Sequence, residues 1–199
     1  MKLDLNIYGI ILVIFILFIC IKIYFESDYH NLRCIVSSVD GNQYCVRETA
    51  KLELVADKLA RVTKKMKTMV YYLYKKYPNR KNCQRLKNRF NPKKIQEILP
   101  TSKYTAYSEN KGEKLAFCTT VKKGGNNLID DNTLTFVALH ELSHIATESV
   151  GHTPEFWNNF KFILKNAVKI KIYKPIDYSK TPREYCSLKI TDNPLYNLS

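Results

Sequence analysis

The stretch ALHELSHIATESVGHTPEFW, residues 138–157, holds three of the four histidines of the chain. His140 and His144 are four residues apart, so on an α-helix both imidazoles lie on one face, about one turn apart. Glu141 follows the first histidine, and seven residues separate His144 from His152. This spacing is typical of a helix that binds zinc through two histidines and places a glutamate beside the metal. The pattern predicts three histidine ligands, with water in the fourth position.

Two alternatives are open for this motif. Short motif matches arise by chance, so the histidines could be ordinary core or surface residues of a helix. A zinc site could also be structural or inactive, although Glu141 is present and no cysteine lies within the cluster to close the coordination shell. The place of His152, after a turn and directly before a capped helix, favours a catalytic zinc site.

The flanking residues predict the helix that the motif requires. The sequence Asp130-Asp131-Asn132-Thr133 favours a helix start, and an apolar stripe at helical spacing follows on a side distinct from the histidines. We therefore expect a buried helix. Its stripe consists of Leu134, Ala138, Leu142 and Ile145.

A turn and a second helix are expected to bring His152 to the pair. Ser149-Val150-Gly151 is a suitable turn, because glycine tolerates the left-handed conformation that ends helices. Thr153-Pro154-Glu155 then predicts a helix start with a capping threonine, a proline at the first position and an acidic first turn. The aromatic face of this helix should lie behind the metal site. Its apolar residues are Phe156, Trp157, Phe160, Ile163, Leu164, Ala167 and Val168.

The N-terminal segment is strongly apolar. Residues 7–21 contain no charged or strongly polar side chain, and the flanking apolar residues extend this segment to nearly 20 residues, enough to span about 30 Å of hydrocarbon. We predict an uncleaved single-pass transmembrane anchor over residues 1–25. A cleaved signal peptide is the main alternative, but Ile19-Cys20-Ile21-Lys22 offers no small-residue cleavage site. The few basic residues on either side do not decide the orientation.

The cysteines leave the redox compartment open. Five of the six lie outside the apolar segment, an odd number for a sealed disulfide framework. Residues 33–39 and 43–47 look like two short strands around Asp40-Gly41-Asn42, a sequence typical of a hairpin turn. Such a hairpin would bring Cys34 and Cys45 together, either as a disulfide or as two ordinary thiols.

The net charge of the chain is +14, and about +13 of it lies in residues 26–199. An acidic partner is compatible with this charge: nucleic acid, anionic lipid headgroups or an acidic protein. A basic but unspecific solvated surface is the alternative, because no nucleic-acid-reading motif accompanies the lysines.

The longest periodic segment runs from Glu48 to Tyr77 and predicts one long helix that ends before Pro78. Its narrow apolar seam could form a coiled-coil dimer, but a domain of this size needs the seam for its own core. The seam consists of Leu52, Val55, Leu59, Val62, Met66, Met69 and Leu73.

Shorter elements are expected between the long helix and the histidine helix. In order they are a loop or weak helix over 77–91, a short helix over 92–99, and two strands over 105–109 and 115–121. Asn110-Lys111-Gly112-Glu113 would join the two strands. An edge strand that borders the cleft could pair with an extended substrate. The sequence after Lys171 shows no periodicity.

The motif predicts a specific chemistry. Zinc held by the three histidines would lower the pKa of its bound water toward ~7 and polarise a substrate carbonyl. Glu141 would act as the general base and return the proton to the leaving amine, so the predicted reaction is peptide-bond hydrolysis. Tyr185 or Arg183 could donate a hydrogen bond to the oxyanion, although a structural role for Tyr185 is the stronger expectation.

The chain resembles the WLM and SprT-like zinc metallopeptidases. The similarity rests on Asn110-Lys111-Gly112 before a strand, on the His140 to His144 motif, and on the Phe156-Trp157 pair shortly after His152. The body also resembles membrane-anchored WLM-like proteins of large DNA viruses, which implies a virion or host membrane. The resemblance implies an α+β zincin fold with Zn²⁺ held by the three histidines and Glu141 as the base. After the anchor, a single metallopeptidase domain would span residues 26–199, with its core over 47–175: a long helix, a small sheet, the histidine helix and a supporting C-terminal helix.

The chain departs from this family in two respects. The gap between His144 and His152 is two residues longer than the usual WLM spacing and shorter than in typical SprT-like members. An anchor is also foreign to the nuclear members, which cleave proteins crosslinked to DNA. We therefore expect a membrane-anchored protease that acts on a protein or peptide. The alternatives are a DNA-stimulated protease that acts on nucleic-acid-bound proteins and a non-catalytic protein stabilised by zinc. The sequence does not indicate the oligomeric state.

Overall fold

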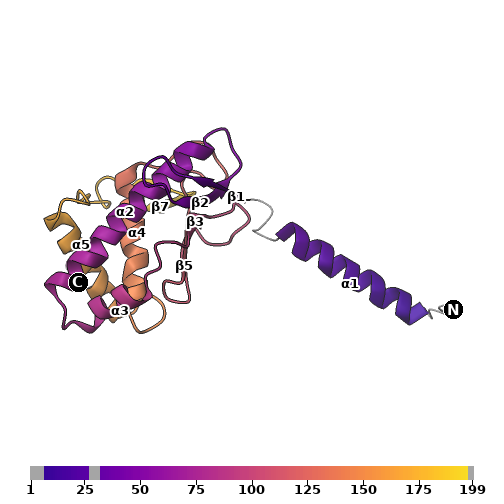
Figure 1. The fold of residues 1–199 in the computed structure, drawn as a ribbon, viewed down its shortest axis with the longest axis horizontal. Helices are drawn as coiled ribbons and strands as arrows, with labels where there is room; N and C mark the ends of the chain where they lie inside the picture. Colours follow the sequence, from indigo (N-terminus) through magenta and orange to yellow (C-terminus); the bar gives the residue numbers. More distant parts are fainter. Residues whose placement is uncertain (1–6, 27–31, 197–199) are drawn as a thin grey trace.

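A computed structural model describes residues 7–26 and 32–196, of which α1 (Ile7–Glu26) is separate from the packed body (Figure 1). The 18-residue window Ile7–Tyr24 has a mean hydropathy of 2.7, and none of it is buried. By length and composition this helix could cross a membrane. It contributes nothing to the core of the body.

The body contains a five-stranded sheet with the strand order β1-β2-β3-β5-β4. Its strands are β1 (Leu32–Val36), β2 (Gln43–Arg47), β3 (Ile95–Glu97), β4 (Ala106–Glu109) and β5 (Lys114–Phe117). The β1–β2 and β4–β5 pairs are antiparallel, whereas β3 pairs in parallel with both β2 and β5. Strand β4 therefore lies at one edge of the sheet.

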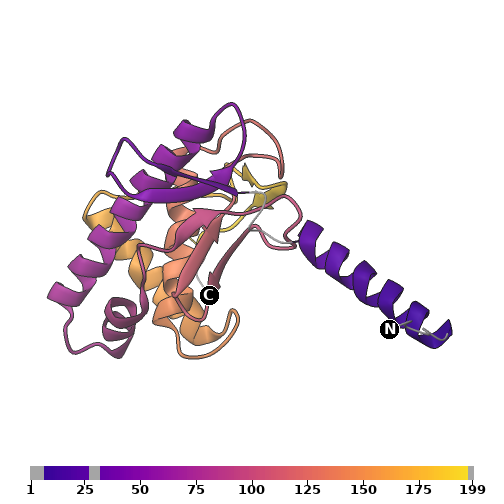
Figure 2. The ribbon, with the colours of Figure 1, turned by 45° about the vertical axis from the view of Figure 1, so that its right-hand side comes forward.

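Four helices lie together beside this sheet (Figures 1 and 2). They are α2 (Leu52–Lys76), α3 (Lys81–Arg89), α4 (Asp131–Ala146) and α5 (Pro154–Lys169). The apolar seam of α2 is buried within its own domain, as expected for a core helix rather than a coiled coil. The mixed α/β architecture with a small sheet agrees with the expected fold class.

The prediction of a short helix over residues 92–99 is wrong, because this segment supplies β3. Ile95 and Glu97 are buried on either side of the half-buried Gln96. The Glu97 carboxylate accepts hydrogen bonds from Arg47 Nε at 2.9 Å and Thr119 Oγ1 at 2.6 Å. Pairing with two neighbouring strands thus overrides the local helical pattern. The weak helix expected before it is the regular helix α3.

The predicted N-terminal hairpin is confirmed. Cys34 and Cys45 are directly opposed on β1 and β2, and they form a disulfide. Gly41 has a φ of 69°, the left-handed conformation that the turn requires.

The C-terminal segment forms a second hairpin. The sequence after Lys171 did not predict it, because its apolar residues show no periodicity. Strands β6 (Arg183–Tyr185) and β7 (Leu188–Ile190) are antiparallel, and a disulfide joins Cys186 in their turn to Cys118 after β5. The hydrophobic core accordingly includes buried side chains from Tyr44 to Cys186. It extends beyond both ends of the expected core, residues 47–175. Of the two cysteines outside these bonds, Cys83 is buried and Cys20 lies on α1.

Candidate metal centre

Helix α4 carries the histidine motif and is almost entirely buried. The Asp130 carboxylate accepts hydrogen bonds from the backbone N–H groups of Asn132 and Thr133, which caps the helix as predicted. All four residues of the apolar stripe are at most 1% exposed, so they fix the helix against the core. His140 and His144 lie on the opposite, half-buried side.

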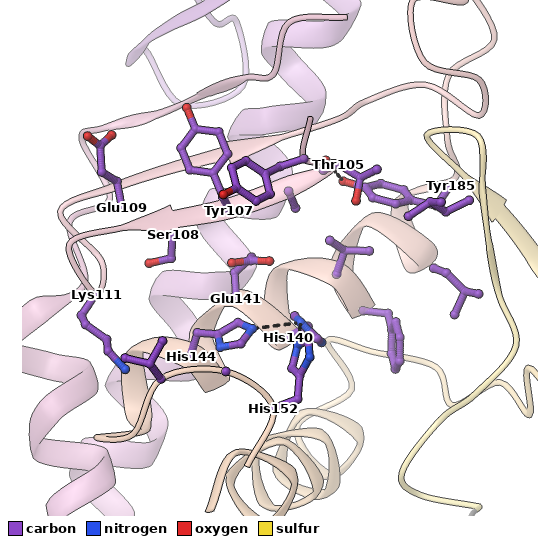
Figure 3. Close-up of a pocket in the computed structure, with 18 of the residues that line it drawn as sticks. Thr105, Tyr107, Ser108, Glu109, Lys111, His140, Glu141, His144, His152 and Tyr185 are labelled. Carbon is purple, nitrogen blue, oxygen red and sulfur yellow. Dashed lines mark hydrogen bonds between the residues drawn. The ribbon is translucent and has the colours of Figure 1, made fainter. Parts of the chain in front are cut away.

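The turn after α4 brings His152 onto this pair (Figure 3). The Nε2 atom of His140 lies 3.1 Å from Nε2 of His144 and 3.1 Å from Nε2 of His152. Tetrahedral ligands about 2.0–2.1 Å from a zinc ion are separated by about 3.3 Å. The three nitrogens therefore converge as ligands of one metal ion would, and the longer gap before His152 does not prevent it.

The pKa values of His140 and His144 favour metal binding, and that of Glu141 favours proton transfer. Burial, with help from the neighbouring imidazoles, lowers the pKa of His140 to about 3 and that of His144 to about 4. Both rings are therefore neutral at physiological pH, the form that binds metals. Glu141 is 5% exposed, and burial raises the pKa of its carboxyl to about 8. A carboxyl with a pKa near neutrality can both accept and release a proton.

Helix α5 supports the three imidazoles from behind, as predicted. The Phe156 ring stacks on His144 with 4.3 Å between centroids, and it also contacts His140 and His152 at 4.9 and 4.7 Å. Trp157 lies 5.6 Å from His152. Thr153 caps the helix, and its side chain accepts a hydrogen bond from the Phe156 backbone N–H. The residues directly after His152 thus fix the orientation of all three rings.

Lys111 holds the turn that carries His152. Its ammonium donates hydrogen bonds to the carbonyls of Thr147, Glu148 and Ser149 at 3.1, 3.3 and 2.7 Å. These carbonyls follow the C-terminus of α4, where a positive charge is favourable. Desolvation lowers the pKa of Lys111.

Arg85 of α3 holds the same turn from the other side. It donates to the Ala146 carbonyl at 2.7 Å and forms ion pairs with Glu148 at 3.1 Å and Glu155 at 2.9 Å. The Glu155 carboxylate in turn accepts hydrogen bonds from the backbone N–H groups of Glu148 and Ser149. This network closes the turn between α4 and α5, and no pattern in the sequence indicated it.

The Asn110-Lys111-Gly112 turn can form only with glycine at its third position. A side chain at Gly112 would place its Cβ 2.8 Å from the Arg89 carbonyl and 3.0 Å from Ile145 of α4, and φ at Gly112 is 112°. Asn110 and Lys111 also have positive φ. The close approach of this turn to α4 lets Lys111 reach the end of that helix.

The centre opens into a cleft of about 1020 Å³ between two walls (Figure 3). One wall, here called the helical wall, consists of α4 and the turn over residues 147–153. The other, the strand wall, consists of β4 and the β6–β7 hairpin. Figure 3 shows Glu141 between the histidines and β4, with Lys111 and Tyr185 on opposite sides of the cleft.

The two residues expected as possible oxyanion donors are placed differently, since Tyr185 lines the cleft and Arg183 does not. Tyr185 lines the cleft but is 3% exposed, and its hydroxyl donates to the Thr105 carbonyl at 3.1 Å. This bond attaches the C-terminal hairpin to the start of β4, which is the structural role that we expected for Tyr185. Arg183 is exposed and is not among the described residues that line the cleft.

Ser108 is a cleft residue that the sequence did not reveal. It is paired with the buried Leu115, so its side chain projects from the sheet on the same side as Leu115. Its Oγ is buried and has no hydrogen-bond partner within the described part of the chain. A buried hydroxyl without a partner in a cleft is available to a bound molecule.

The fold and the histidine cluster define a mixed α/β protein with a candidate metal centre in a cleft. No family model matches the chain. The chain belongs to the family of uncharacterized protein R325 of Acanthamoeba polyphaga mimivirus: the two are 31% identical over 195 residues, 94% of this chain and 93% of that protein.

Two further relatives are also viral and match over shorter segments. Uncharacterized protein 136R of Invertebrate iridescent virus 6 is 37% identical over 62 residues, 31% of this chain and 35% of that protein. Uncharacterized protein 042R of Invertebrate iridescent virus 3 is 34% identical over 85 residues, 42% of this chain and 50% of that protein. The relatives are viral, as the sequence resemblance predicted.

Among solved structures, Wss1 from Saccharomyces cerevisiae is similar, with a TM-score of 0.47 and 17% identity over 64% of this chain and 88% of that chain. A Wss1 mutant gives a TM-score of 0.44 and 16% identity over 64% of this chain and 89% of that chain.

Proposed function

We propose that this chain is a membrane-anchored zinc metallopeptidase that hydrolyses peptide bonds. The observation that carries the proposal is the convergence of three imidazole nitrogens beside a buried carboxyl, in a cleft bordered by an edge strand. A structural zinc site normally has four protein ligands, whereas three histidines leave a position open.

The zinc ion would be held by His140, His144 and His152. When bound, it supplies a Lewis acid that acidifies water and polarises a carbonyl oxygen. Because burial keeps His140 and His144 unprotonated, little proton release opposes binding at neutral pH.

Glu141 would act as the general base and then as the general acid. Its carboxyl lies between the histidines and β4, the position through which a peptide bond aligned on β4 would pass. It would take the proton of the attacking water and deliver it to the leaving amine. Strand β4, at the edge of the sheet, would hold the substrate backbone in an extended conformation.

Helix α1 would anchor the protease in a membrane, because it is long and apolar enough to span one and is not used in the core. The two disulfides, Cys34–Cys45 and Cys118–Cys186, favour an oxidising compartment for the body.

Metal content and cleavage, measured on the full chain in detergent micelles, test the proposal. The wild type should bind about one zinc per chain and cleave peptides until a chelator removes the metal. His140→Ala should lose both properties, because it removes one of the three ligands of the metal. His30→Ala, at the fourth histidine of the sequence, is the control and should keep both. Zinc-loaded wild type that cleaves no peptide or protein would contradict the proposal.

A second candidate function is a DNA-stimulated protease, and the distribution of charge favours it. Between Lys58 and Gln96 the chain has 14 Lys and Arg and no Asp or Glu, which equals the net charge of +14 of the whole chain. Most of these side chains are exposed on α2, on α3 and in the segment after α3. Such a surface would bind nucleic acid in a strongly salt-dependent way. Single- or double-stranded DNA that neither binds at low salt nor changes the rate of cleavage would exclude this function.

A further inference from the structure

The two ends of the cleft differ in chemistry. At one end lie Glu109, Lys111 and Lys114, after or near the end of β4. At the other end, the apolar side chains of Phe136 and Val137 lie one turn before His140 on α4. The hairpin residues Leu188 and Ile190 border the cleft with them.

Strand β4 and helix α4 run in the same direction along the cleft. Near its start, β4 is attached to the hairpin by the Tyr185–Thr105 hydrogen bond. After its end, Lys111 binds carbonyls beyond the C-terminus of α4. The hairpin end is therefore the N-terminal end of both elements, and the Lys111 end is their C-terminal end.

This geometry gives a bound peptide a direction. Antiparallel pairing on the edge of β4 is the more stable arrangement per residue. A peptide in this arrangement has its N-terminal part near Lys111 and its C-terminal part near the hairpin. The peptide residue on the C-terminal side of the bond aligned with Glu141 therefore lies toward the apolar end of the cleft.

The apolar end has the features of a side-chain subsite. Leu188 is 58% exposed although it borders the cleft, and Ile190 lies on the same side of β7 two residues on. Phe136 and Val137 close the subsite from the helical wall at 5% and 9% exposure. Among the described residues that line this end of the cleft, only Lys189 is charged.

The β6–β7 hairpin is held beside the cleft by a disulfide and by hydrogen bonds to the segment after β5. A two-stranded hairpin of this size is marginal by itself. The Cys118–Cys186 disulfide joins its turn to the end of β5, and the backbone N–H groups of Cys186 and Ser187 donate to the carbonyls of Thr120 and Val121. The subsite is thus a fixed feature of the cleft.

We propose that Phe136, Val137, Leu188 and Ile190 form the subsite for the residue after the cleaved bond, and that this subsite selects a large apolar side chain such as Leu, Ile, Phe or Met. The inference rests on the proposed peptidase function and adds the class of substrate.

Cleavage of a peptide library by the zinc-loaded full chain, read out by mass spectrometry, tests the subsite. Large apolar residues should be enriched directly after the cleaved bonds. Leu188→Glu should lower kcat/KM for such peptides about tenfold. The matched control is Leu54→Glu, since Leu54 on α2 is 57% exposed and lies outside the cleft. A preference for small or acidic residues after the bond, or equal activity of Leu188→Glu and wild type, would overturn the inference.

A binding experiment separates the subsite from catalysis. Labelled alanine-rich octapeptides that contain one Leu, Ser or Glu are titrated into the Glu141→Gln variant. The Leu peptide should bind about tenfold more tightly than the others, and Leu188→Glu in the same background should abolish the difference. Equal affinities would overturn the subsite whether or not the wild type cleaves peptides. Absence of cleavage together with a Leu preference would contradict only the peptidase function.

Discussion

The helical wall and the strand wall of the cleft are built from the sequence in different ways. The helical wall comes from one continuous stretch, in which His140, Glu141, His144 and His152 are already neighbours. The strand wall joins β4 to a hairpin about 80 residues further along the chain, through the Tyr185–Thr105 hydrogen bond and a disulfide. The chemistry of the site is therefore local in the sequence, whereas the surface that would select a substrate depends on long-range contacts.

This difference predicts that the two walls respond to different changes. Changes in the helical wall should alter metal binding, the titration of the centre or the catalytic step. Changes in the strand wall should alter the use of substrates and leave the metal in place.

The largest effect is expected from the buried carboxyl of the helical wall, in the chelator-treated protein. Folding raises the pKa of the Glu141 carboxyl from 4.5 to about 8. The contribution of the neutral carboxyl to the stability of the wild type is therefore fully present below pH 4.5, and it is lost as the pH rises to about 8. Glutamine cannot ionise. The free energy of unfolding of Glu141→Gln relative to wild type should therefore rise by a few kcal/mol over this range.

Denaturant unfolding at several pH values measures this difference. The histidines are present in both proteins, so their titration cancels. Saturating zinc should reduce the difference, because a nearby cation favours the carboxylate. A difference that stays constant between pH 4.5 and 8 would show that Glu141 is not buried as described.

An intermediate effect is expected from the turn that carries His152. Lys111→Met removes the hydrogen bonds to three carbonyls in this turn. Zinc affinity should fall about 10–100-fold, the usual range when a group that orients a metal ligand is lost. Lys111→Arg should restore part of the affinity. Lys114→Met is the control, because Lys114 lines the cleft but pairs with Glu109. Competition with a chromogenic chelator measures the affinities, and equal values for the two methionine variants would contradict this role.

A smaller effect on activity is expected from the strand wall. Replacing both Cys118 and Cys186 by Ser should lower kcat/KM for apolar peptides about tenfold, with zinc content unchanged, because the hairpin is no longer held beside the cleft. Replacing Cys34 and Cys45 by Ser removes the other disulfide, which lies at the opposite edge of the sheet from β4, and should leave kcat/KM unchanged. Each pair should also cost about 2–5 kcal/mol of stability. Loss of zinc in the Cys118/Cys186 variant would mean that the walls are not independent.

The same difference explains how much could be predicted from the sequence. The capped helix, the turn at Gly151 and the aromatic helix behind the histidines follow from local patterns, and the structure confirms them. The local sequence predicts a helix where β3 forms, because the pairing of β3 with β2 and β5 depends on residues far away in the chain. The β6–β7 hairpin and the Arg85 network depend on residues far apart in the chain, so no periodicity marks them. The candidate site could thus be predicted better than the cleft around it.

In the proposed mechanism, Glu141 acts as the base beside a zinc ion held by three histidines. The most direct test measures zinc content and kcat together, for the wild type, Glu141→Gln and the control Glu53→Gln, which changes an exposed glutamate of α2. We expect about one zinc per chain in all three proteins and a kcat about 10²–10⁴-fold lower only in Glu141→Gln. Wild-type kcat in Glu141→Gln, or zinc binding that survives the loss of His140, would contradict it.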